Sequence, residues 1–246
     1  MRTVVVGASS GLGRSIGIGL ARQGASTALL ARRHDRLVDA AKEAGPGTLA
    51  IQCDVTSAES CKRAIEEAVN GLGGIDALVY APGVGPLIRI EDIDAETWHS
   101  TFATNVVGAS LVTAAAIPHL TESGGTAAYL STVSASVTDP WPGLGAYAVT
   151  KAALDKLVQA WQIEHPKVGF TRVVVGNCVG GEGHSGTEFA SGWDLSLVGE
   201  VHPTWETRGY ITNTFLPVEE LVRVVHNVLS NGASTSVPTV VVGPRL

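Results

Sequence analysis

The chain has 246 residues, 45% of them hydrophobic, and carries a formal net charge of −6 at neutral pH. This length and composition suffice for one α/β domain with a full core, so we expect a single domain over residues 1–246. The acidic balance, with no basic run longer than Arg32-Arg33, argues against nucleic acid and membrane surfaces as partners and favours a small molecule. Met1-Arg2 leads directly into an apolar run, which leaves no room for a signal segment, and a cytoplasmic location is expected.

Short apolar or β-branched runs alternate with helical stretches along the chain. Strands are expected near residues 3–7, 26–31, 48–53, 75–80, 126–132, 169–175 and 238–242, with helices between them. Such alternation is typical of a parallel sheet with helices on both faces. The predicted fold class is therefore α/β, a doubly wound parallel sheet of about seven strands.

Two of the intervening helices show a one-sided pattern. Between residues 59 and 72, and again at 219–229, apolar side chains recur at three- and four-residue intervals. The apolar stretch 106–118 is interrupted by small and polar residues and is too short to span a bilayer, so we interpret it as a buried helix. Residues 180–216 fit neither period, and a long irregular stretch in a compact domain indicates a lid over a site.

The first strand is followed directly by the glycine-rich sequence Gly7-Ala8-Ser9-Ser10-Gly11-Leu12-Gly13. A tight turn between a strand and a helix presents main-chain N–H groups and the positive helix end, which together can hold a pyrophosphate. The spacing is looser than the dinucleotide fingerprint G-x-G-x-x-G, and glycine-rich turns without a ligand are common. In this context the turn indicates nucleotide binding, with contacts from Gly7, Ser9, Ser10, Gly11, Leu12 and Gly13.

The end of the second strand, Ala31-Arg32-Arg33, lies where dinucleotide-binding folds contact the adenosine ribose. The acid that usually binds the ribose hydroxyls there is missing. Arg32 and Arg33 instead offer guanidinium groups that suit a 2′-phosphate, and Ser9 can add a hydroxyl contact. NADP(H) is therefore favoured over NAD(H). The alternative is that both arginines form a solvated start to the second helix.

A second motif, Tyr147-Ala148-Val149-Thr150-Lys151, supplies an acid. Tyr147 and Lys151 are four residues apart, so they share one face of a helix. An ammonium group beside the phenol would favour the phenolate and lower the pKa of the tyrosine. The alternative for Tyr147 is a packed helix residue with its hydroxyl at the surface.

With both motifs in this order, the chain resembles the short-chain dehydrogenase/reductase family over nearly its full length. The resemblance implies a Rossmann-like fold and an oxidoreductase that uses NAD(P)(H). It also implies that Asp54 contacts the adenine amino group with Val55 beside it, and that Asn105 holds a water in a proton relay. Tyr147 and Lys151 match the Y-x-x-x-K catalytic pair of the family.

Two loops depart from the family pattern. Tyr80-Ala81-Pro82-Gly83 replaces the usual N-N-A-G after the fourth strand, and Pro82 has no N–H to donate. Ala81 and Gly83 are still expected at the cofactor. The usual P-G after the sixth strand is replaced by Asn177-Cys178-Val179-Gly180-Gly181, with Thr187 in the role of the threonine that follows.

The position of the catalytic hydroxyl differs between two counts. Counting from the glycines before the fifth strand gives Thr132, whereas counting back from Tyr147 gives Ser134. The strand-anchored count is preferred, because Asp139-Pro140-Trp141-Pro142 resembles an inserted turn that lengthens the spacing. Both residues remain candidates, and the alternative is that they are small polar residues at a strand end.

We therefore expect reversible hydride transfer between the nicotinamide and a carbonyl or alcohol carbon, with Tyr147 as acid or base. One alternative is an NADP(H)-binding sensor or scaffold with little turnover, and another is an epimerase or dehydratase. The scattered histidines and cysteines indicate no metal site. The family resemblance implies a homodimer or homotetramer formed through the helices of Asn105 and Tyr147, where Ala109, Val112 and Ala116 would permit contact.

Overall fold

The computed structural model describes residues 1–181 and 186–245. Its seven parallel strands lie in the order β3-β2-β1-β4-β5-β6-β7. This arrangement confirms the predicted doubly wound sheet. The strands are β1 Arg2–Val6, β2 Ser26–Ala31, β3 Leu49–Gln52, β4 Ala77–Tyr80, β5 Thr126–Thr132, β6 Gly169–Val175 and β7 Thr239–Val242.

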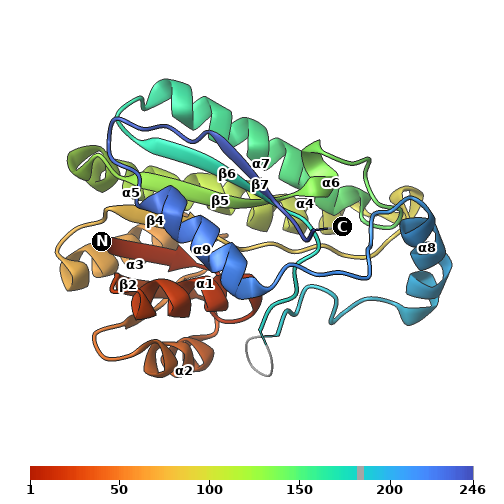
Figure 1. Cartoon of the computed structure of the whole chain (residues 1–246), viewed down its shortest axis with the longest axis horizontal. Coiled ribbons are helices and arrows are strands. Elements are labelled where there is room, and N and C mark those ends of the chain that lie inside the picture. Colours follow the sequence, from red (N-terminus) through yellow and green to blue (C-terminus); the bar gives the residue numbers. More distant parts are fainter. Residues whose placement is uncertain (182–185, 246) are drawn as a thin grey trace.

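Helices cover both faces of the sheet (Figure 1). On one face lie α1 (Gly11–Arg22), α2 (His34–Ala44) and α9 (Val218–Leu229), and their buried side chains form one apolar layer with the sheet. On the other face lie α3 (Ala58–Leu72), α5 (Gly108–Ser123) and α7 (Gly145–Glu164), which form the second layer. The remaining elements are a 3-10 turn at Ile90–Asp92, α4 at Ala95–Phe102, a π-helical turn at Ala103–Val107, α6 at Val133–Ser136 and α8 at Leu195–Thr207.

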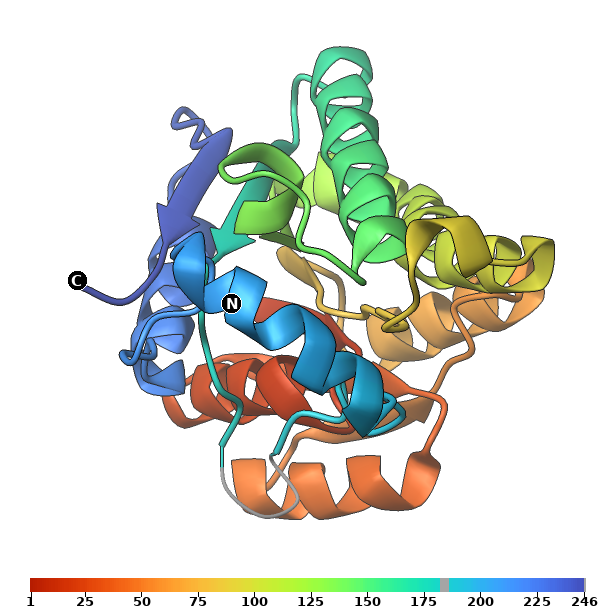
Figure 2. The same cartoon turned by 90° about the vertical axis from the view of Figure 1, so that its right-hand side faces the viewer.

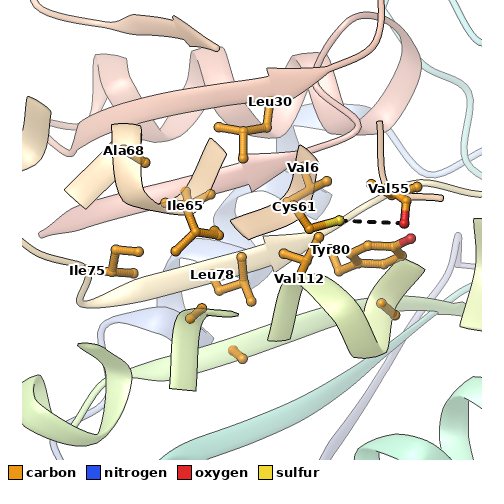
Figure 3. Packing of buried hydrophobic residues seen from close by; sticks show 14 of the residues in the cluster. Val6, Leu30, Val55, Cys61, Ile65, Ala68, Ile75, Leu78, Tyr80 and Val112 are labelled. Atoms are coloured by element: carbon orange, nitrogen blue, oxygen red, sulfur yellow. Dashed lines mark hydrogen bonds between the residues drawn. The ribbon is translucent and has the colours of Figure 1, made fainter. Parts of the chain in front are cut away.

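The second layer illustrates why the periodic segments fold as helices. Cys61, Ile65 and Ala68 are completely or almost completely buried on one side of α3, as the spacing predicted. Figure 3 shows Cys61 and Ile65 directed toward side chains of the sheet, with the Cys61 thiol 3.6 Å from the Val55 carbonyl oxygen. Burial of this apolar surface away from water is the main favourable term that holds α3 on the sheet.

The direction of strand order reverses at β1, which pairs with β2 on one side and β4 on the other. Connections from β1 and β4 therefore leave the sheet toward opposite faces. In open parallel sheets a crevice forms at such a point, outside the carboxyl ends of the strands. The glycine-rich turn after β1 and the Ala81 loop after β4 lie at this crevice.

The segment expected to be an irregular lid contains a helix. α8 follows Asp194, whose carboxylate accepts a hydrogen bond from the Ser196 N–H, and it buries Val201 and Trp205. Pro203 and Gly199 obscure this helix in the sequence because both are poor helix formers. In Figure 2, α8 crosses in front of the carboxyl edge of the sheet. The part of the predicted lid at 182–185 lies outside the described residues.

The helix around residues 106–118 is longer than predicted. α4, the π-helical turn and α5 run continuously from Ala95 to Ser123, and one 18-residue window has a mean hydropathy of 1.4. Length and composition alone would allow this run to cross a membrane, but core helices meet the same test. Ala109, Val112 and Ala116 are fully buried in the layer shared with α3, so these residues cannot supply the subunit contact expected of them.

Candidate active site

A cleft of about 990 Å³ opens at the carboxyl edge of the sheet. It reaches from the glycine-rich turn to Tyr147 and continues beneath the segment that leads into α8. All residues expected to bind the cofactor line this one cleft, namely Gly7, Ser9, Ser10, Gly11, Leu12, Gly13, Arg32, Arg33, Asp54, Val55, Ala81, Gly83, Tyr147, Lys151 and Thr187. The fold thus brings together segments that are far apart in the sequence.

The glycine-rich turn requires glycine at specific positions. Gly7 has a φ of +81°, and a Cβ added there would lie 2.8 Å from the Pro82 nitrogen. A Cβ on Gly13 would lie 2.4 Å from the Gly7 carbonyl oxygen, so the start of α1 packs directly on the turn. Ser10, the N-cap of α1, makes no side-chain capping bond. The main-chain N–H groups of the first turn of α1 are therefore not satisfied by a capping side chain, as an anion site requires.

Arg33, rather than Arg32, contacts the glycine-rich turn. Its guanidinium donates to Ser9 Oγ at 3.0 Å and to Ser10 Oγ at 2.8 Å. The Arg32 side chain is exposed, and the charge of this residue acts on Asp54. Arg36, on α2, joins Arg33 in pairing with the carboxylate of Glu188. The sequence analysis did not include Arg36 in the site. Its position three residues after Arg33 could have indicated that the two guanidinium groups lie side by side.

Asp54 and Val55 follow the end of β3 and line the cleft. The Asp54 carboxylate accepts hydrogen bonds from the main-chain N–H and the hydroxyl of Thr56, and these bonds lower the pKa of the carboxyl group. Val55 is almost fully buried. Asp54 is thus held as an anion at the edge of the cleft, where it can accept a hydrogen bond from an amino group.

The pKa of Tyr147 is not lowered by Lys151, as the sequence led us to expect, but raised. Burial raises the pKa of Tyr147 to about 12, and a hydrogen bond with the Thr132 side chain opposes this shift. The Lys151 ammonium lies 5.9 Å from the centroid of the Tyr147 ring. The desolvation of the phenolate therefore outweighs the stabilisation expected from the lysine, and the phenol is protonated at neutral pH.

Lys151 is held by main-chain oxygens. Its Nζ donates to the Leu130 carbonyl at 2.8 Å and to the Pro82 carbonyl at 3.2 Å. The side chain is only 2% exposed, and this burial lowers the pKa of Lys151 to about 8, while the charge of Asp155 acts in the opposite direction. The use of the Pro82 carbonyl shows how the unusual loop after β4 fits the site despite its missing N–H.

The two candidate hydroxyls lie together at the carboxyl end of β5. Thr132 ends this strand and caps α6, and its Oγ1 lies 3.2 Å from Ser134 Oγ. Both side chains line the cleft. Thr132 is the one whose side chain lowers the pKa of Tyr147 against the effect of burial, whereas Ser134 is almost fully buried in the first turn of α6.

Asn105 is buried beneath the cleft and is not among the residues that line it. It lies in the π-helical turn between α4 and α5. Its side-chain amide donates to the Val84 carbonyl and to Thr150 Oγ1, and its oxygen accepts from the Val84 N–H, each at 2.9 Å. Asn105 therefore ties the loop after β4 to the helix that carries Tyr147 and Lys151.

The other unusual loop fastens the segment that covers the cleft. The Asn177 side chain donates to the Tyr210 carbonyl at 3.0 Å, and the Leu216 N–H donates to the Asn177 carbonyl at 2.8 Å. Thr187 lies against Gly11, and a Cβ on that glycine would be 3.4 Å from the Thr187 Cα. The family resemblance gave Thr187 the role of the threonine that follows the sixth strand, and in the structure this residue lines the same cleft as the glycine-rich turn.

Aromatic side chains form the wall of the cleft opposite the sheet. Phe189 packs edge-on against Tyr147 with ring centroids 4.8 Å apart, and Trp193 packs on Phe189 at 5.4 Å. The Trp193 indole donates to the Gly85 carbonyl at 2.8 Å. These contacts belong to a small apolar cluster centred on α8, separate from the two layers of the sheet. The sequence indicated an aromatic lid but not its contact with the tyrosine.

Comparison with known proteins identifies relatives of this arrangement. The family model for short chain dehydrogenase matches residues 2–184. The chain is 33% identical over 166 residues to 11-beta-hydroxysteroid dehydrogenase-like 2 of Arabidopsis thaliana, a match that covers 65% of this chain and 53% of the relative. It is 36% identical over 159 residues to an oxidoreductase of Methylorubrum extorquens, and this match covers 63% of this chain and 62% of the relative. The chain thus spans about half the length of the plant relatives it matches.

Solved structures resemble the whole chain. An alcohol dehydrogenase from the archaeon Thermococcus sibiricus, complexed with 5-hydroxy-NADP, superposes with a TM-score of 0.79 at 27% identity and covers 98% of this chain and 95% of its own. A 3-ketoacyl-(acyl-carrier-protein) reductase from Brucella melitensis, complexed with NADH, superposes with a TM-score of 0.81 at 22% identity. This match covers 98% of this chain and 96% of the reductase. The second likeness concerns the fold alone.

Proposed function

This chain belongs to the short-chain dehydrogenase family, and from that membership and its cleft we propose that it is an NADP(H)-dependent oxidoreductase that interconverts a carbonyl and an alcohol. The observation that carries the proposal is the position of Tyr147. Lys151 lies beside its ring, and Thr132, Ser134 and the glycine-rich turn line the same cleft. An acid, a second hydroxyl and a dinucleotide-sized channel are what a carbonyl reductase requires.

The residues present fit a dinucleotide. The first turn of α1 offers main-chain N–H groups without a side-chain cap, and Arg33 and Arg36 already bind a carboxylate. Gly7, Gly11 and Gly13 would hold the pyrophosphate, Asp54 the adenine, and Lys151 the ribose nearest the reacting ring. When bound, the nicotinamide ring supplies the hydride or accepts it.

In the reductive direction Tyr147 would give its phenolic proton to the oxygen of the carbonyl that is reduced. The raised pKa of the Tyr147 phenol, about 12, keeps that proton on the residue at neutral pH. Thr132 or Ser134 holds the developing oxyanion by a hydrogen bond, and the buried ammonium of Lys151 stabilises the phenolate that forms. In oxidation the same phenolate accepts the proton of the alcohol.

NADP(H) is favoured over NAD(H) because of the cluster at the adenosine end. Arg33 and Arg36, with the hydroxyls of Ser9 and Ser10, present cations and donors to one point. A 2′-phosphate forms charge-assisted hydrogen bonds with such groups, whereas the ribose hydroxyl of NAD(H) makes weaker neutral ones.

The substrate is proposed to be uncharged and partly apolar. Among the described residues that line the cleft, the charged ones are Arg32, Arg33, Asp54 and Glu188 at the adenosine end and Lys151 at the centre. Beyond Tyr147 the described wall consists of aromatic and aliphatic side chains such as Trp141, Trp193 and Phe215, with threonine and serine hydroxyls. The names of the plant relatives, 11-beta-hydroxysteroid dehydrogenases, agree with an apolar ring ketone or alcohol.

The proposal is tested by following NADPH and NADH oxidation at 340 nm with a panel of neutral cyclic ketones, acidic keto acids and acyl thioesters. We expect turnover with neutral cyclic ketones and a preference for NADPH. The sensor alternative would be favoured if NADPH binds tightly but no carbonyl is reduced, and if no substrate is converted in the presence of a catalytic amount of the cofactor. Conversion of substrate with no net change in the cofactor would favour the epimerase or dehydratase alternative.

A homo-oligomer is also proposed, through the helices that bear Asn105 and Tyr147. Val107 and Val149 on these helices are 48% and 45% exposed, unlike the buried α5 residues first considered. Apolar side chains exposed on neighbouring helices favour association with a second copy. Light scattering after size exclusion measures the state directly, and a monomer at micromolar concentration would contradict this assignment.

A further inference from the structure

We propose that residues Gly186–Phe189 act as a built-in competitor of the cofactor, in which Glu188 occupies the site of the 2′-phosphate and must leave it when NADP(H) binds. The inference rests on the proposed function, because it assigns a partner to the same anion site. It makes Glu188 a residue that sets the strength and selectivity of cofactor binding.

The first observation is the ion-pair cluster at the adenosine end. One carboxylate oxygen of Glu188 pairs with Arg33 and the other with Arg36, although Glu188 follows β6 and the arginines follow β2. These two bonds, with Arg36 the stronger influence, lower the pKa of the Glu188 carboxyl group, which is therefore an anion at neutral pH. A carboxylate between two guanidinium groups has the chemistry of a bound phosphate.

The second observation is independent and concerns the pyrophosphate end. The Gly11 N–H, at the first position of α1, donates to the Gly186 carbonyl at 3.2 Å. Thr187 lies against Gly11, as its Cα would be 3.4 Å from a Cβ placed there. An oxygen of the covering segment thus satisfies a donor in the turn that the dinucleotide is expected to use.

The third observation links these contacts to the reaction centre. Phe189 directly follows Glu188 and packs on the Tyr147 ring, with centroids 4.8 Å apart. A Cβ on Gly85 would lie 2.3 Å from the tip of the Phe189 ring, so this loop accommodates the phenyl group only because it has glycine. The segment therefore lies over the anion sites at one end and over the tyrosine at the other.

Charge decides the exchange. A 2′-phosphate carries nearly two negative charges and several acceptor oxygens, so it competes well for Arg33 and Arg36 against the single charge of Glu188. The 2′-hydroxyl of NAD(H) has no charge and cannot displace the carboxylate. Removal of the Glu188 charge should thus strengthen the binding of ligands with a 2′-phosphate and leave the affinity for ligands without this phosphate unchanged.

The test uses two fragments that lack the nicotinamide, adenosine 2′,5′-bisphosphate and 5′-AMP. Their dissociation constants are measured by calorimetry on the full chain as wild type, Glu188→Gln and Glu200→Gln. The last variant is the matched control. Glu200 lies on α8, pairs with Arg89 at 2.5 Å and does not line the cleft. We expect Glu188→Gln to bind the bisphosphate about threefold to tenfold more tightly, the effect of two partly exposed ion pairs. Binding of 5′-AMP should change less than about twofold.

An unchanged dissociation constant for the bisphosphate in both Glu188→Gln and Glu188→Ser would overturn the competitor role, as would equal changes for both fragments. Weaker binding in these variants would show instead that Glu188 is a direct ligand, and it too would overturn the inference. The proposed function fails separately if the wild type binds the bisphosphate no more tightly than 5′-AMP and if Arg33→Met leaves both dissociation constants unchanged. Circular dichroism on each variant verifies that it is folded.

Discussion

Phe189 meets Tyr147 edge-on, with 4.8 Å between the ring centroids and an angle of 64° between the planes. The contact shields part of the phenol ring of Tyr147, a half-buried residue that lines the cleft. Burial is the largest influence on the pKa of Tyr147, which rises to about 12. The covering aromatic wall therefore helps to keep Tyr147 protonated, the state needed to donate a proton to a carbonyl.

Replacement of Phe189 by alanine should make Tyr147 easier to ionise. Water would reach the phenol, and we expect its pKa to fall by about one unit. Alcohol oxidation requires the phenolate, so its kcat/KM should begin to rise at lower pH than in the wild type. Phe215→Ala is the control, because Phe215 also lines the cleft but has no contact with Tyr147 among the aromatic pairs of the described residues. Identical pH profiles for wild type and Phe189→Ala would contradict the covering role.

Carbonyl reduction should depend on the ionisation of Lys151. Burial lowers the pKa of this lysine to about 8, so its positive charge is present below that pH and is lost above it. The cation stabilises the tyrosinate formed in the reaction, and kcat/KM for reduction should therefore be constant near neutral pH and fall above about 8. Lys156→Gln, which changes an exposed lysine on the same helix, should leave the inflection in place. A profile that stays level far into the alkaline range would argue against this role.

The two hydroxyls at the end of β5 should differ in their effect on turnover. Thr132 lines the cleft and its side chain lowers the pKa of Tyr147 against the effect of burial, so Thr132→Val should reduce kcat by about 10²–10³, as the loss of one oxyanion donor does. Ser134→Ala should cost less than about tenfold, and Thr132→Ser should retain most of the activity. Steady-state kinetics under saturating cofactor measure all three. A larger loss in Ser134→Ala than in Thr132→Val would assign the catalytic hydroxyl to Ser134.

Asn105 should contribute strongly to stability. Asn105→Ala leaves the N–H and carbonyl of Val84 without their side-chain partner in a partly buried position, which costs about 2–4 kcal/mol of unfolding free energy. Thr150→Val removes one partner of the same amide and should cost about 1 kcal/mol. Urea denaturation compares the two. Equal costs for both variants would show that Asn105 does not hold the Val84 loop.

Much of the fold and of the candidate site could be predicted from the sequence, because their signals are local. The strands are short apolar runs, and Gly7, Gly11 and Gly13 identify the turn after the first of them. The spacing of Tyr147 and Lys151 is a helical repeat, and the structure places both on α7. Each of these features depends on neighbouring residues that can be recognised without knowledge of distant contacts.

Features that depend on distant parts of the chain could not be predicted. Glu188 meets Arg33 across 155 residues, and no local pattern links them. The pKa of Tyr147 was expected to fall because Lys151 is near in sequence, but the burial of the phenol dominates. Helix α8 was missed because Pro203 and Gly199 hide its amphipathic pattern, which becomes apparent only when Val201 and Trp205 pack under the covering segment.

The most direct test of the account is the replacement of Tyr147 by phenylalanine, which removes the hydroxyl and keeps the ring that Phe189 and Lys151 contact. Reduction of a neutral cyclic ketone by NADPH is followed in single turnovers, and NADPH binding is measured by calorimetry on the same variant. We predict an affinity for NADPH within about twofold of the wild type and a hydride-transfer rate lower by at least about 10³. Hydride transfer at close to the wild-type rate would contradict the assignment of Tyr147 as the acid.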